Sequence, residues 1–467
     1  MINNKILREY DIRGIYGETL TKQDAFLIGW SLGRYVRSNF SNRKNFAINV
    51  CRDGRTSSKG LSKKLIDGLL NAGVFVNDIG LGPTPMLYFS TFFGNALAGI
   101  MITGSHNPAE YNGFKFIVDK QPFFGKQIKE LRKISGKYLL SECEGFHKAK
   151  MLEHEFIAKY VDLLLNTYPK NTNLKIIWDP GNGATADVIT KLCKKLPGKH
   201  IVINSKIDGS FPAHHPDPTV PENLEQLIYA VKSNSYDLGI AFDGDGDRLG
   251  VVDESGRIVW GDQLMIIFAR DVLKSNPGAC IIADVKASNT LFEEIKKYGG
   301  VPVISKTGHS NIKKKMKELN ALIAGEMSGH IFFADNYFGY DDALYAAVRL
   351  IDILVRTRSS LSKVLDTLPK IHNTPEIRLK CEDTMKFKVI EEIKALLLKK
   401  KISFIDIDGI RCSTDGGWWL LRASNTQDMI VCRFEADTEF KIKEQKKFVS
   451  KLLKPYKIYS SEKLFVT

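Results

Sequence analysis

Residues 97–108 read Leu-Ala-Gly-Ile-Met-Ile-Thr-Gly-Ser-His-Asn-Pro, an apolar run that changes abruptly into a polar loop. The apolar run predicts a buried strand, and the loop would lie at its carboxyl end, where open α/β sheets bind their ligands. Gly104 permits a tight turn, Pro108 stiffens the loop, and His106 could carry a proton. Taken alone, the motif also fits an ordinary turn. As an active-site loop it would present Ser105 as the reactive group.

The same order of elements is predicted three times along the chain. Each copy contains a strand, a helix, a second strand, a second helix and a third strand, followed by a chemically rich loop. The copies begin with strands at 46–50, 175–178 and 280–283, and their rich loops are 103–108, 243–248 and 325–330. The last part differs, with consecutive predicted strands at 403–413, 417–423 and 429–435.

Strands that alternate with helices are typical of parallel-type α/β layers, and 467 residues exceed what a single core organises. We expect an α/β protein with three similar mixed-sheet domains and a C-terminal α+β domain around a central cleft. The expected domains are 1–150 with the serine loop, 151–254 with an acidic loop, 255–368 with the loop 325–330, and 369–467 with a loop at 422–426.

The charge of the chain points to an anionic ligand. The sequence has 67 Lys and Arg against 53 Asp and Glu, a net charge of +14. Much of the excess is dispersed lysine, as in Lys313-Lys314-Lys315 and 399–401, which we interpret as solvated helix faces. An anionic small substrate therefore explains the charge better than nucleic acid, and we expect no nucleic-acid partner.

Cysteine usage and hydropathy predict a cytoplasmic protein without membrane contact. The seven cysteines show no C-x-x-C or Cys/His spacing, which predicts free thiols and no zinc site. The uncharged segment 86–104 is nearly long enough to cross a bilayer, but its Ser, Thr, Gly and Asn residues predict a short helix, a break and a strand in a buried core. Residues 1–5 contain no apolar core of a signal peptide.

Asp243, Asp245 and Asp247 alternate with glycine in the second rich loop. In an extended loop the three carboxylates would point the same way and repel one another unless a cation were present. Hard oxygen ligands suit Mg²⁺ or Ca²⁺. With Glu254 the spacing partly matches an EF-hand, but Arg248 stands where that loop needs glycine, so we reject an EF-hand. Three protein ligands would leave Mg²⁺ with open positions for a phosphoryl oxygen and water.

Three further motifs suit a sugar phosphate. Glu326, Ser328 and His330 alternate, so they share one side of an extended loop, where a carboxylate and a hydroxyl can bind sugar hydroxyls. The segment 422–426, Arg-Ala-Ser-Asn-Thr, offers a guanidinium, two hydroxyls and an amide, a set that binds phosphate. The segment 307–310, Thr-Gly-His-Ser, precedes a predicted helix whose N-terminus would attract an anion, although its serine also fits a simple helix cap.

Two other segments leave alternatives open. Residues 181–186, Gly-Asn-Gly-Ala-Thr-Ala, match the dinucleotide fingerprint G-x-G-x-x-A, but no acidic residue ends the following strand to hold a ribose. We therefore do not expect NAD. The N-terminal cluster 8–14 places arginines beside Tyr10 and could bind anions or form a surface arm. Together, the serine loop, the metal loop and the phosphate-binding loop imply phosphoryl transfer on a polyol phosphate.

The chain carries four loops that resemble, in order and spacing, the four signature loops of the α-D-phosphohexomutase family. These loops are 103–108, 243–248, 325–330 and 422–426. The resemblance covers essentially the whole chain. The last two loops, together with Phe-Pro-Ala-His-His-Pro-Asp-Pro at 211–218, resemble the phosphomannomutase/phosphoglucomutase branch rather than the phosphoglucosamine mutase branch.

The resemblance implies that Ser105 carries a phosphoryl group, with Mg²⁺ held by Ser105 (through its phosphate), Asp243, Asp245 and Asp247. The serine would phosphorylate O1 or O6 of a hexose monophosphate, and the resulting 1,6-bisphosphate would turn over before its other phosphate returns to the serine. Glucose 1,6-bisphosphate or mannose 1,6-bisphosphate is the expected activator.

The resemblance also implies roles for other side chains. The expected catalytic residues are Ser105, His106, Lys115, Arg13, Arg248 and His330. The general acid or base stays open among His330, Lys115 and Arg13. The expected substrate-binding residues are Tyr10, Lys286, His309, Glu326, Ser328, Arg422, Ser424, Asn425 and Thr426.

These observations predict an isomerase that interconverts hexose 6-phosphate and hexose 1-phosphate for nucleotide-sugar biosynthesis, acting as a monomer. Phosphoglucosamine mutase is the alternative within the same class, distinguished by the rates on the three sugar phosphates. A non-catalytic phosphosugar- or polyanion-binding protein is the alternative from another class, but it would have no use for a serine beside a metal. An NAD-dependent dehydrogenase is the most distant alternative.

Overall fold

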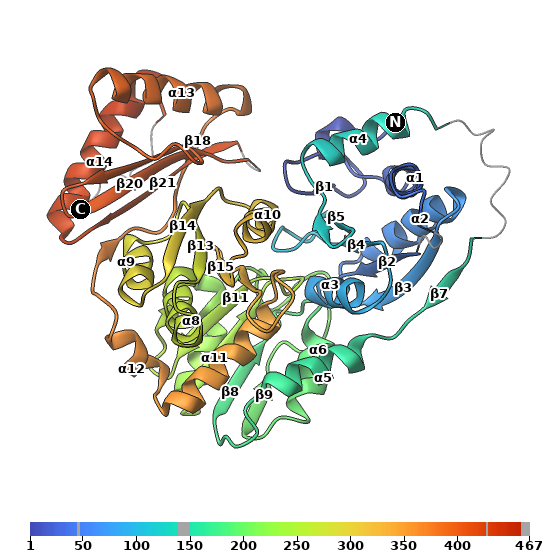
Figure 1. The fold of residues 1–467 in the computed structure, drawn as a ribbon, viewed down its shortest axis with the longest axis horizontal. Coiled ribbons are helices and arrows are strands. Elements are labelled where there is room, and N and C mark those ends of the chain that lie inside the picture. Colours follow the sequence, from blue (N-terminus) through green and yellow to red (C-terminus); the bar gives the residue numbers. More distant parts are fainter. Residues whose placement is uncertain (44–46, 139–148, 426–427, 459–467) are drawn as a thin grey trace.

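The computed structural model describes residues 1–43, 47–138, 149–425 and 428–458 of the chain. Within these ranges the chain forms four β-sheets with helices packed on them, as Figure 1 shows. None of the helices in the described ranges has both the length and the apolar character needed to cross a bilayer. The cysteines in these ranges are free thiols.

The first domain contains a seven-stranded mixed sheet of order β1-β5-β4-β2-β3-β7, with β6 beside β5. The strands β4, β2, β3 and β7 run parallel, whereas β5 is antiparallel to both β4 and β1. The strands are β1 (Ile12–Ile15), β2 (Ala47–Arg52), β3 (Phe75–Leu81), β4 (Ala98–Ile102), β5 (Tyr111–Val118), β6 (Gln121–Pro122) and β7 (Met151–Glu153). The helices are α1 (Lys22–Asn39), α2 (Ser58–Asn71), α3 (Thr84–Phe93) and α4 (Lys126–Ser135). The predicted helix, break and strand of the segment 86–104 are therefore confirmed as α3 and β4.

The second domain contains a five-stranded sheet of order β12-β11-β10-β8-β9. The strand β8 is parallel to β9 and β10, and β11 is antiparallel to β10 and β12. The strands are β8 (Lys175–Asp179), β9 (Lys199–Val202), β10 (Leu238–Phe242), β11 (Leu249–Asp253) and β12 (Ile258–Val259), and the helices are α5 (Ile157–Thr167), α6 (Ala186–Cys193) and α7 (Glu225–Ser233).

The third domain contains a four-stranded sheet of order β14-β13-β15-β16, in which β13 is parallel to β14 and β15, and β16 is antiparallel to β15. The strands are β13 (Cys280–Asp284), β14 (Val301–Ser305), β15 (Ile323–Gly325) and β16 (Ile331–Phe333). The helices are α8 (Gly261–Ser275), α9 (Asn289–Lys297), α10 (His309–Leu319), α11 (Ala343–Thr357) and α12 (Leu361–Asp366). The helices α8, α11 and α12 lie outside the predicted repeat.

The three sheets share one topological feature that explains the repeat. In each sheet the third strand of the copy is parallel to the first and antiparallel to the strand that follows it: β4 and β5, β10 and β11, β15 and β16. The rich loops join these antiparallel pairs. The repeat in the sequence therefore places the serine loop, the acidic loop and the loop 325–330 at equivalent positions of three sheets.

The fourth domain is an antiparallel sheet of order β17-β21-β20-β19, with β18 beside β21. The strands are β17 (His372–Asn373), β18 (Ile377–Lys380), β19 (Ile410–Thr414), β20 (Gly417–Ala423) and β21 (Met429–Ala436), and the helices are α13 (Asp383–Lys399) and α14 (Glu439–Leu453). The predicted strand 403–413 is wrong over most of its length, because only an isolated bridge at Ile405 precedes β19.

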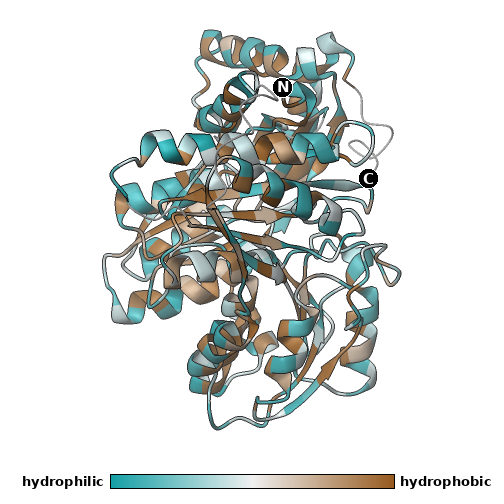
Figure 2. Cartoon of the chain, turned by 90° about the vertical axis from the view of Figure 1, so that its right-hand side faces the viewer, coloured by the Kyte–Doolittle hydropathy of each residue, from teal (hydrophilic) through white to brown (hydrophobic). Residues whose placement is uncertain are grey.

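The apolar cores show how the domains are connected. One large core runs through the second and third domains and includes α3 of the first, whereas the first domain also has a core of its own. Among the described residues, the fourth domain has a separate core and shares a small apolar cluster with the third, which consists of Val285, Trp418 and Leu420. Figure 2 shows hydrophobic residues concentrated on the central strands. Polar contacts also cross this boundary, such as those of Lys286 with Glu376 and of Arg433 with Asp262. A domain with its own core and a largely polar interface is the one expected to move on ligand binding.

Candidate active site

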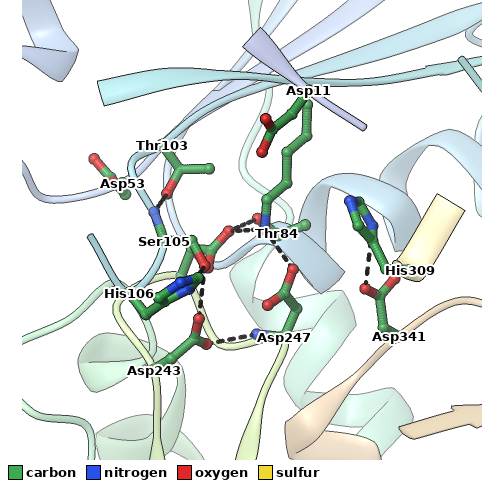
Figure 3. Close-up of polar contacts among 12 residues, drawn as sticks. Asp11, Asp53, Thr84, Thr103, Ser105, His106, Asp243, Asp247, His309 and Asp341 are labelled. Atoms are coloured by element: carbon green, nitrogen blue, oxygen red, sulfur yellow. Dashed lines mark hydrogen bonds and ion pairs between the residues drawn. The ribbon is translucent and has the colours of Figure 1, made fainter. Parts of the chain in front are cut away.

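Ser105 lies in the loop after β4 and is almost completely buried. Its φ of 49° is in the left-handed region, which costs a residue other than glycine about 1–3 kcal/mol. The hydroxyl of Ser105 donates to Asp243 Oδ2 at 2.8 Å, and it lies 3.3 Å from Nδ1 of His106 (Figure 3). The backbone N–H of Ser105 donates to Thr103 Oγ1 at 2.8 Å. The strained backbone therefore directs the hydroxyl at the acidic loop of the second domain.

Arg55 supports the serine loop, although no motif marks it in the sequence. Its buried guanidinium lies 3.2 Å from Asp53 and donates to four backbone carbonyls of the loop at 2.5–3.0 Å. The acceptors are the carbonyls of Ser105, Asn107, Pro108 and Tyr111. A Cβ at Gly104 would lie only 2.6 Å from this guanidinium, so the glycine is needed for the close approach. A buried cation bonded to four carbonyls is a tertiary feature without a local sequence signal.

The acidic loop brings three buried carboxylates together, as its alternating pattern predicts. One oxygen from each of Asp243, Asp245 and Asp247 lies within 4.8 Å of the others. The backbone N–H groups of Asp247 and Arg248 each donate to Asp243 Oδ1 at 3.1 Å. Gly244 passes so close to the serine loop that a Cβ would lie 2.6 Å from the carbonyl oxygen of Ser105. The glycine that separates two of the aspartates therefore also permits contact with the serine loop.

Two groups of the first domain enter the acidic cluster. Lys115 of β5 is buried, and its Nζ donates to Asp245 Oδ2 at 2.7 Å and to Asp247 Oδ2 at 2.5 Å. The hydroxyl of Thr84, at the start of α3, also donates to Asp245 Oδ2. The pKa of Lys115 is raised because the carboxylates outweigh the effect of burial. Lys115 is therefore a permanent positive charge in the site.

The acidic cluster has the properties of a cation site. Burial, and then repulsion by Asp245 and Asp247, raise the pKa of Asp243 well above its usual value. Asp245 Oδ1 and Asp247 Oδ1 are buried and have no hydrogen-bond partner. Buried carboxylate oxygens without a partner are costly unless a cation satisfies them. The donor set, all oxygen, fits a hard divalent cation such as Mg²⁺.

In the loop 325–330, Glu326 accepts hydrogen bonds from the backbone of Gly308 at 2.6 Å and from the hydroxyl of Ser328 at 3.0 Å. Burial acts to raise the pKa of Glu326, but the nearby charges of His330 and Lys286 outweigh it, so this pKa is lowered. Glu326 is therefore an ionised acceptor, as suits the binding of hydroxyl groups.

His309 and His330 stack on each other beside Asp341. Their ring centroids are 5.8 Å apart and their planes are inclined by 15°. The Nδ1 atom of His330 lies 3.2 Å from Asp341 Oδ2, and that of His309 lies 3.5 Å from the same oxygen. Arg248 Nε donates to Nε2 of His330 at 3.1 Å. Asp341 follows β16 and was not identified from the sequence.

The phosphate-binding loop of the fourth domain reaches the N-terminal arm of the first. The side-chain amide of Asn425 donates to the Tyr10 hydroxyl at 2.8 Å. Arg422 is buried, and its guanidinium pairs with Asp408 at 3.0 Å. The backbone N–H of Ser424 donates to the carbonyl of Met429 at 2.9 Å. Thr426 lies outside the described residues.

The remaining predicted residues are also held by partners. Arg13 of β1 donates to Asn107 Oδ1 and to Asp11 Oδ2, both at 2.7 Å, which places it beside the serine loop. Lys286 pairs with Glu376 of the fourth domain at 2.7 Å. The carboxylates of Asp408 and Glu376 thus neutralise two predicted substrate-binding cations, and nothing in their local sequence marks them.

Family models match almost the entire chain. Their descriptions are "Phosphoglucomutase/phosphomannomutase, alpha/beta/alpha domain I" for residues 4–139, domain II for 155–256, domain III for 260–371, and "C-terminal domain" for 376–452. The chain belongs to the phosphoglucomutase/phosphomannomutase family.

Individual members of the phosphoglucomutase/phosphomannomutase family are similar over nearly their full length. Phosphomannomutase/phosphoglucomutase of Pseudomonas aeruginosa is 43% identical over 434 residues, which are 93% of this chain and 92% of that protein. Phosphoglucomutase of Neisseria gonorrhoeae is 41% identical over 442 residues, 94% of each chain. The crystal structure of a family protein from Burkholderia thailandensis superposes with a TM-score of 0.89 at 38% identity and covers 98% of both chains.

Proposed function

We propose that this enzyme interconverts the 6-phosphate and the 1-phosphate of a hexose, mannose or glucose, through a phosphoserine at Ser105 and a hexose 1,6-bisphosphate. The observation that supports the proposal most directly is the hydrogen bond of 2.8 Å from the Ser105 hydroxyl to Asp243 of the acidic loop. A serine next to an oxygen-rich cation site is the arrangement that phosphoryl transfer requires.

The acidic loop would serve the transferring phosphoryl group. Asp243, Asp245 and Asp247, together with a phosphate oxygen on Ser105, would hold Mg²⁺, which supplies positive charge to that group when it is bound. Lys115 lies against two of the three aspartates and adds a second positive charge at the same place.

In the forward half-reaction, the bond between phosphorus and the serine oxygen breaks and a bond to O1 or O6 of the sugar forms. The hydroxyl proton of the sugar passes to a base, and the serine oxygen takes a proton. The bisphosphate then reverses its orientation, and its other phosphoryl group returns to Ser105. Glucose 1,6-bisphosphate or mannose 1,6-bisphosphate would therefore act as the activator that phosphorylates a bare serine.

Among the candidates for proton transfer, the histidines suit the role better than the cations. Arg13 cannot lose its proton in a protein, and the raised pKa of Lys115 keeps that group charged. Burial, followed by the charge of Arg248, lowers the pKa of His106, whose Nδ1 lies 3.3 Å from the Ser105 hydroxyl. We propose His106 for the proton of the serine, and His330 for that of the sugar hydroxyl once its Nε2 has exchanged the hydrogen bond from Arg248 for one from the substrate.

Glu326 and Ser328 would bind the sugar hydroxyls in either orientation, with His309 and Lys286 beside them. Arg422 and the 424–426 segment would hold the phosphate that does not react. Because Asn425 contacts Tyr10 across the first and fourth domains, closure of the fourth domain would exclude water from the phosphoserine.

We also propose the division into domains at 1–150, 151–254, 255–368 and 369–467, a monomeric state and a cytoplasmic location. Because β7 pairs with β3 and β12 pairs with β11, the first two sheets extend to residues 153 and 259, and we move the first two proposed boundaries to just after these residues. The proposed substrates are hexose phosphates, and the pathway is nucleotide-sugar biosynthesis.

Mass spectrometry can test the phosphoserine. The purified protein would be mapped before and after incubation with glucose 1,6-bisphosphate and Mg²⁺, beside Ser105→Ala and a control variant at the exposed Ser233, Ser233→Ala. We expect phosphate on the Ser105 peptide, exchangeable with mannose or glucose 1-phosphate, and loss of interconversion only in Ser105→Ala. A bare Ser105 peptide, or an equally active Ser105→Ala, would refute the mechanism.

A further inference from the structure

Lys313 is part of the candidate site, contrary to the expectation that residues 313–315 form a solvated helix face. It lies in α10, one turn after His309, and its side chain is only 10% exposed. The side chains of Lys314 and Lys315 are 66% and 39% exposed, as that expectation requires. The interpretation is wrong for Lys313 because, of these three lysines, it is the one whose ammonium group lies against Tyr88 of the first domain.

Three groups surround the Lys313 ammonium group. It donates to Asp341 Oδ1 at 3.0 Å and to the Tyr88 hydroxyl at 3.2 Å, and it lies 4.4 Å from the centre of the Tyr88 ring. Its third partner is Nδ1 of His309, at 3.2 Å. Burial acts to lower the pKa of Lys313, but the charge of Asp341 outweighs it and the pKa is raised. Lys313 is therefore a charged group that can only donate hydrogen bonds.

These contacts determine where His309 carries its proton. Burial, and then the charge of Lys313, lower the pKa of His309, so the ring is neutral and has a single N–H. Because Lys313 donates to Nδ1, that atom must provide the lone pair, and the proton belongs on Nε2. The competing arrangement, with an N–H on Nδ1 directed at Asp341 Oδ2, spans the longer distance of 3.5 Å.

The neighbouring His330 has the opposite arrangement. Its Nε2 accepts from Arg248 Nε at 3.1 Å, and a guanidinium is exclusively a donor. The hydrogen bond from Arg248 therefore uses the Nε2 lone pair of His330, and carboxylate oxygens of Asp341 and Asp247 lie 3.2 and 3.5 Å from its Nδ1. Asp341 thus lies beside Nδ1 of both stacked rings. The two rings differ in their cationic partner, because Lys313 contacts Nδ1 of His309 whereas Arg248 contacts Nε2 of His330.

We propose that Lys313 is a positioning residue that keeps the proton of His309 on Nε2, so that this nitrogen is a hydrogen-bond donor, in contrast to Nε2 of the stacked His330, which accepts from Arg248. This role rests on the proposed function, in which both rings serve a sugar phosphate. A donor at Nε2 of His309 suits a phosphate or ether oxygen of the substrate. A substrate that binds in two orientations presents such an oxygen in each of them.

Histidine-selective ¹⁵N NMR tests the proposal without substrate, since the two ring nitrogens of each tautomer have distinct chemical shifts. The signals of His309 are identified by their loss in His309→Gln. We expect a proton on Nε2 of His309 in the wild type, in Lys313→Arg and in the exposed control Lys314→Met, and a shift of the proton to Nδ1 in Lys313→Met. A proton on Nδ1 of His309 in the wild type, or an unchanged tautomer in Lys313→Met, would overturn the proposal.

Steady-state kinetics provide the second readout. Loss of a donor that contacts substrate equally in the ground state and the transition state raises KM without lowering kcat. We expect Lys313→Met to raise KM about tenfold with kcat within about threefold, Lys313→Arg to recover most of this change, and Lys314→Met to behave as the wild type. A lowered kcat at constant KM, or no recovery with arginine, would contradict the proposal. If the wild type shows no mutase activity, the proposed function fails, whereas the NMR result still stands.

Discussion

Arg55→Met tests whether a buried guanidinium keeps Ser105 in its strained conformation. The substitution preserves much of the side-chain volume but removes the ion pair with Asp53 and the hydrogen bonds to four carbonyls of the serine loop. The left-handed φ of 49° at Ser105 must be offset by these contacts. Without them, we expect the loop to relax and the serine hydroxyl to leave its position beside Asp243.

The contacts of Arg55 determine how much stability the substitution should cost. Hydrogen bonds to a charged group contribute about 1.5–3 kcal/mol each, so four of them set an upper bound of about 6–12 kcal/mol. Water can reach part of the released loop, and removal of one partner of a buried ion pair typically costs about 3–5 kcal/mol, which we take as the loss of stability. For a domain of this size, such a loss corresponds to a fall in Tm of about 10 °C. A displacement of about 1 Å at the serine should lower kcat about 100-fold.

Calorimetry and steady-state kinetics measure both effects, with Arg43→Met as the matched control. Arg43 pairs with Asp119 at 2.6 Å on the surface of the same domain, and both side chains are about half exposed (50% and 46%). Such a pair contributes about 0–1 kcal/mol, so the control should keep its Tm within a few degrees and its kcat unchanged. If Arg55→Met keeps kcat within about threefold of the wild type, the support of the serine loop by Arg55 is refuted.

Three further perturbations have defined outcomes. Burial raises the pKa of the Asp342 carboxyl group to about 6. In the folded protein this carboxyl group is protonated at pH 4 but carries a buried negative charge at pH 7. In the unfolded chain the same charge lies in water. The wild type should therefore lose about 2 kcal/mol of stability relative to Asp342→Asn between pH 4 and pH 7, and paired melting scans that show a constant difference would argue against this. Tyr10→Phe removes the hydroxyl that accepts a hydrogen bond from Asn425 and so connects the first and fourth domains. In steady-state assays we expect KM to rise about 2–10-fold. An unchanged KM would show that this contact does not contribute to closure of the fourth domain. Removal of metal ions by a chelator should abolish activity, and Mg²⁺ at about 100 times its Kd should restore it. The bound Mg²⁺ should also raise the free energy of unfolding by about 2.7 kcal/mol, and Asp245→Asn should lose most of this increase.

The local sequence was sufficient to predict those parts of the site and the fold that depend on residues close together in the chain. The alternation of aspartate and glycine over 243–247 predicts three adjacent carboxylates, and they lie together in the structure. The apolar run before Ser105 predicts the strand β4 for the same reason, because the signal is carried by neighbouring residues. In the fourth domain the residues 403–409 also read as a strand, but they pair only through an isolated bridge, since pairing depends on a partner strand.

The sequence by itself determined the repeated α/β pattern, the four loops and the residue types that phosphoryl transfer needs, because each of these depends on periodicity and spacing along the chain. Only the tertiary structure decided which charges the site uses. Arg55, Asp341 and Lys313 show no local motif, and Lys313 differs from Lys314 only in the direction it faces from α10. A buried charge is stable where partners from distant segments surround it, and those partners meet only after the domains have packed together.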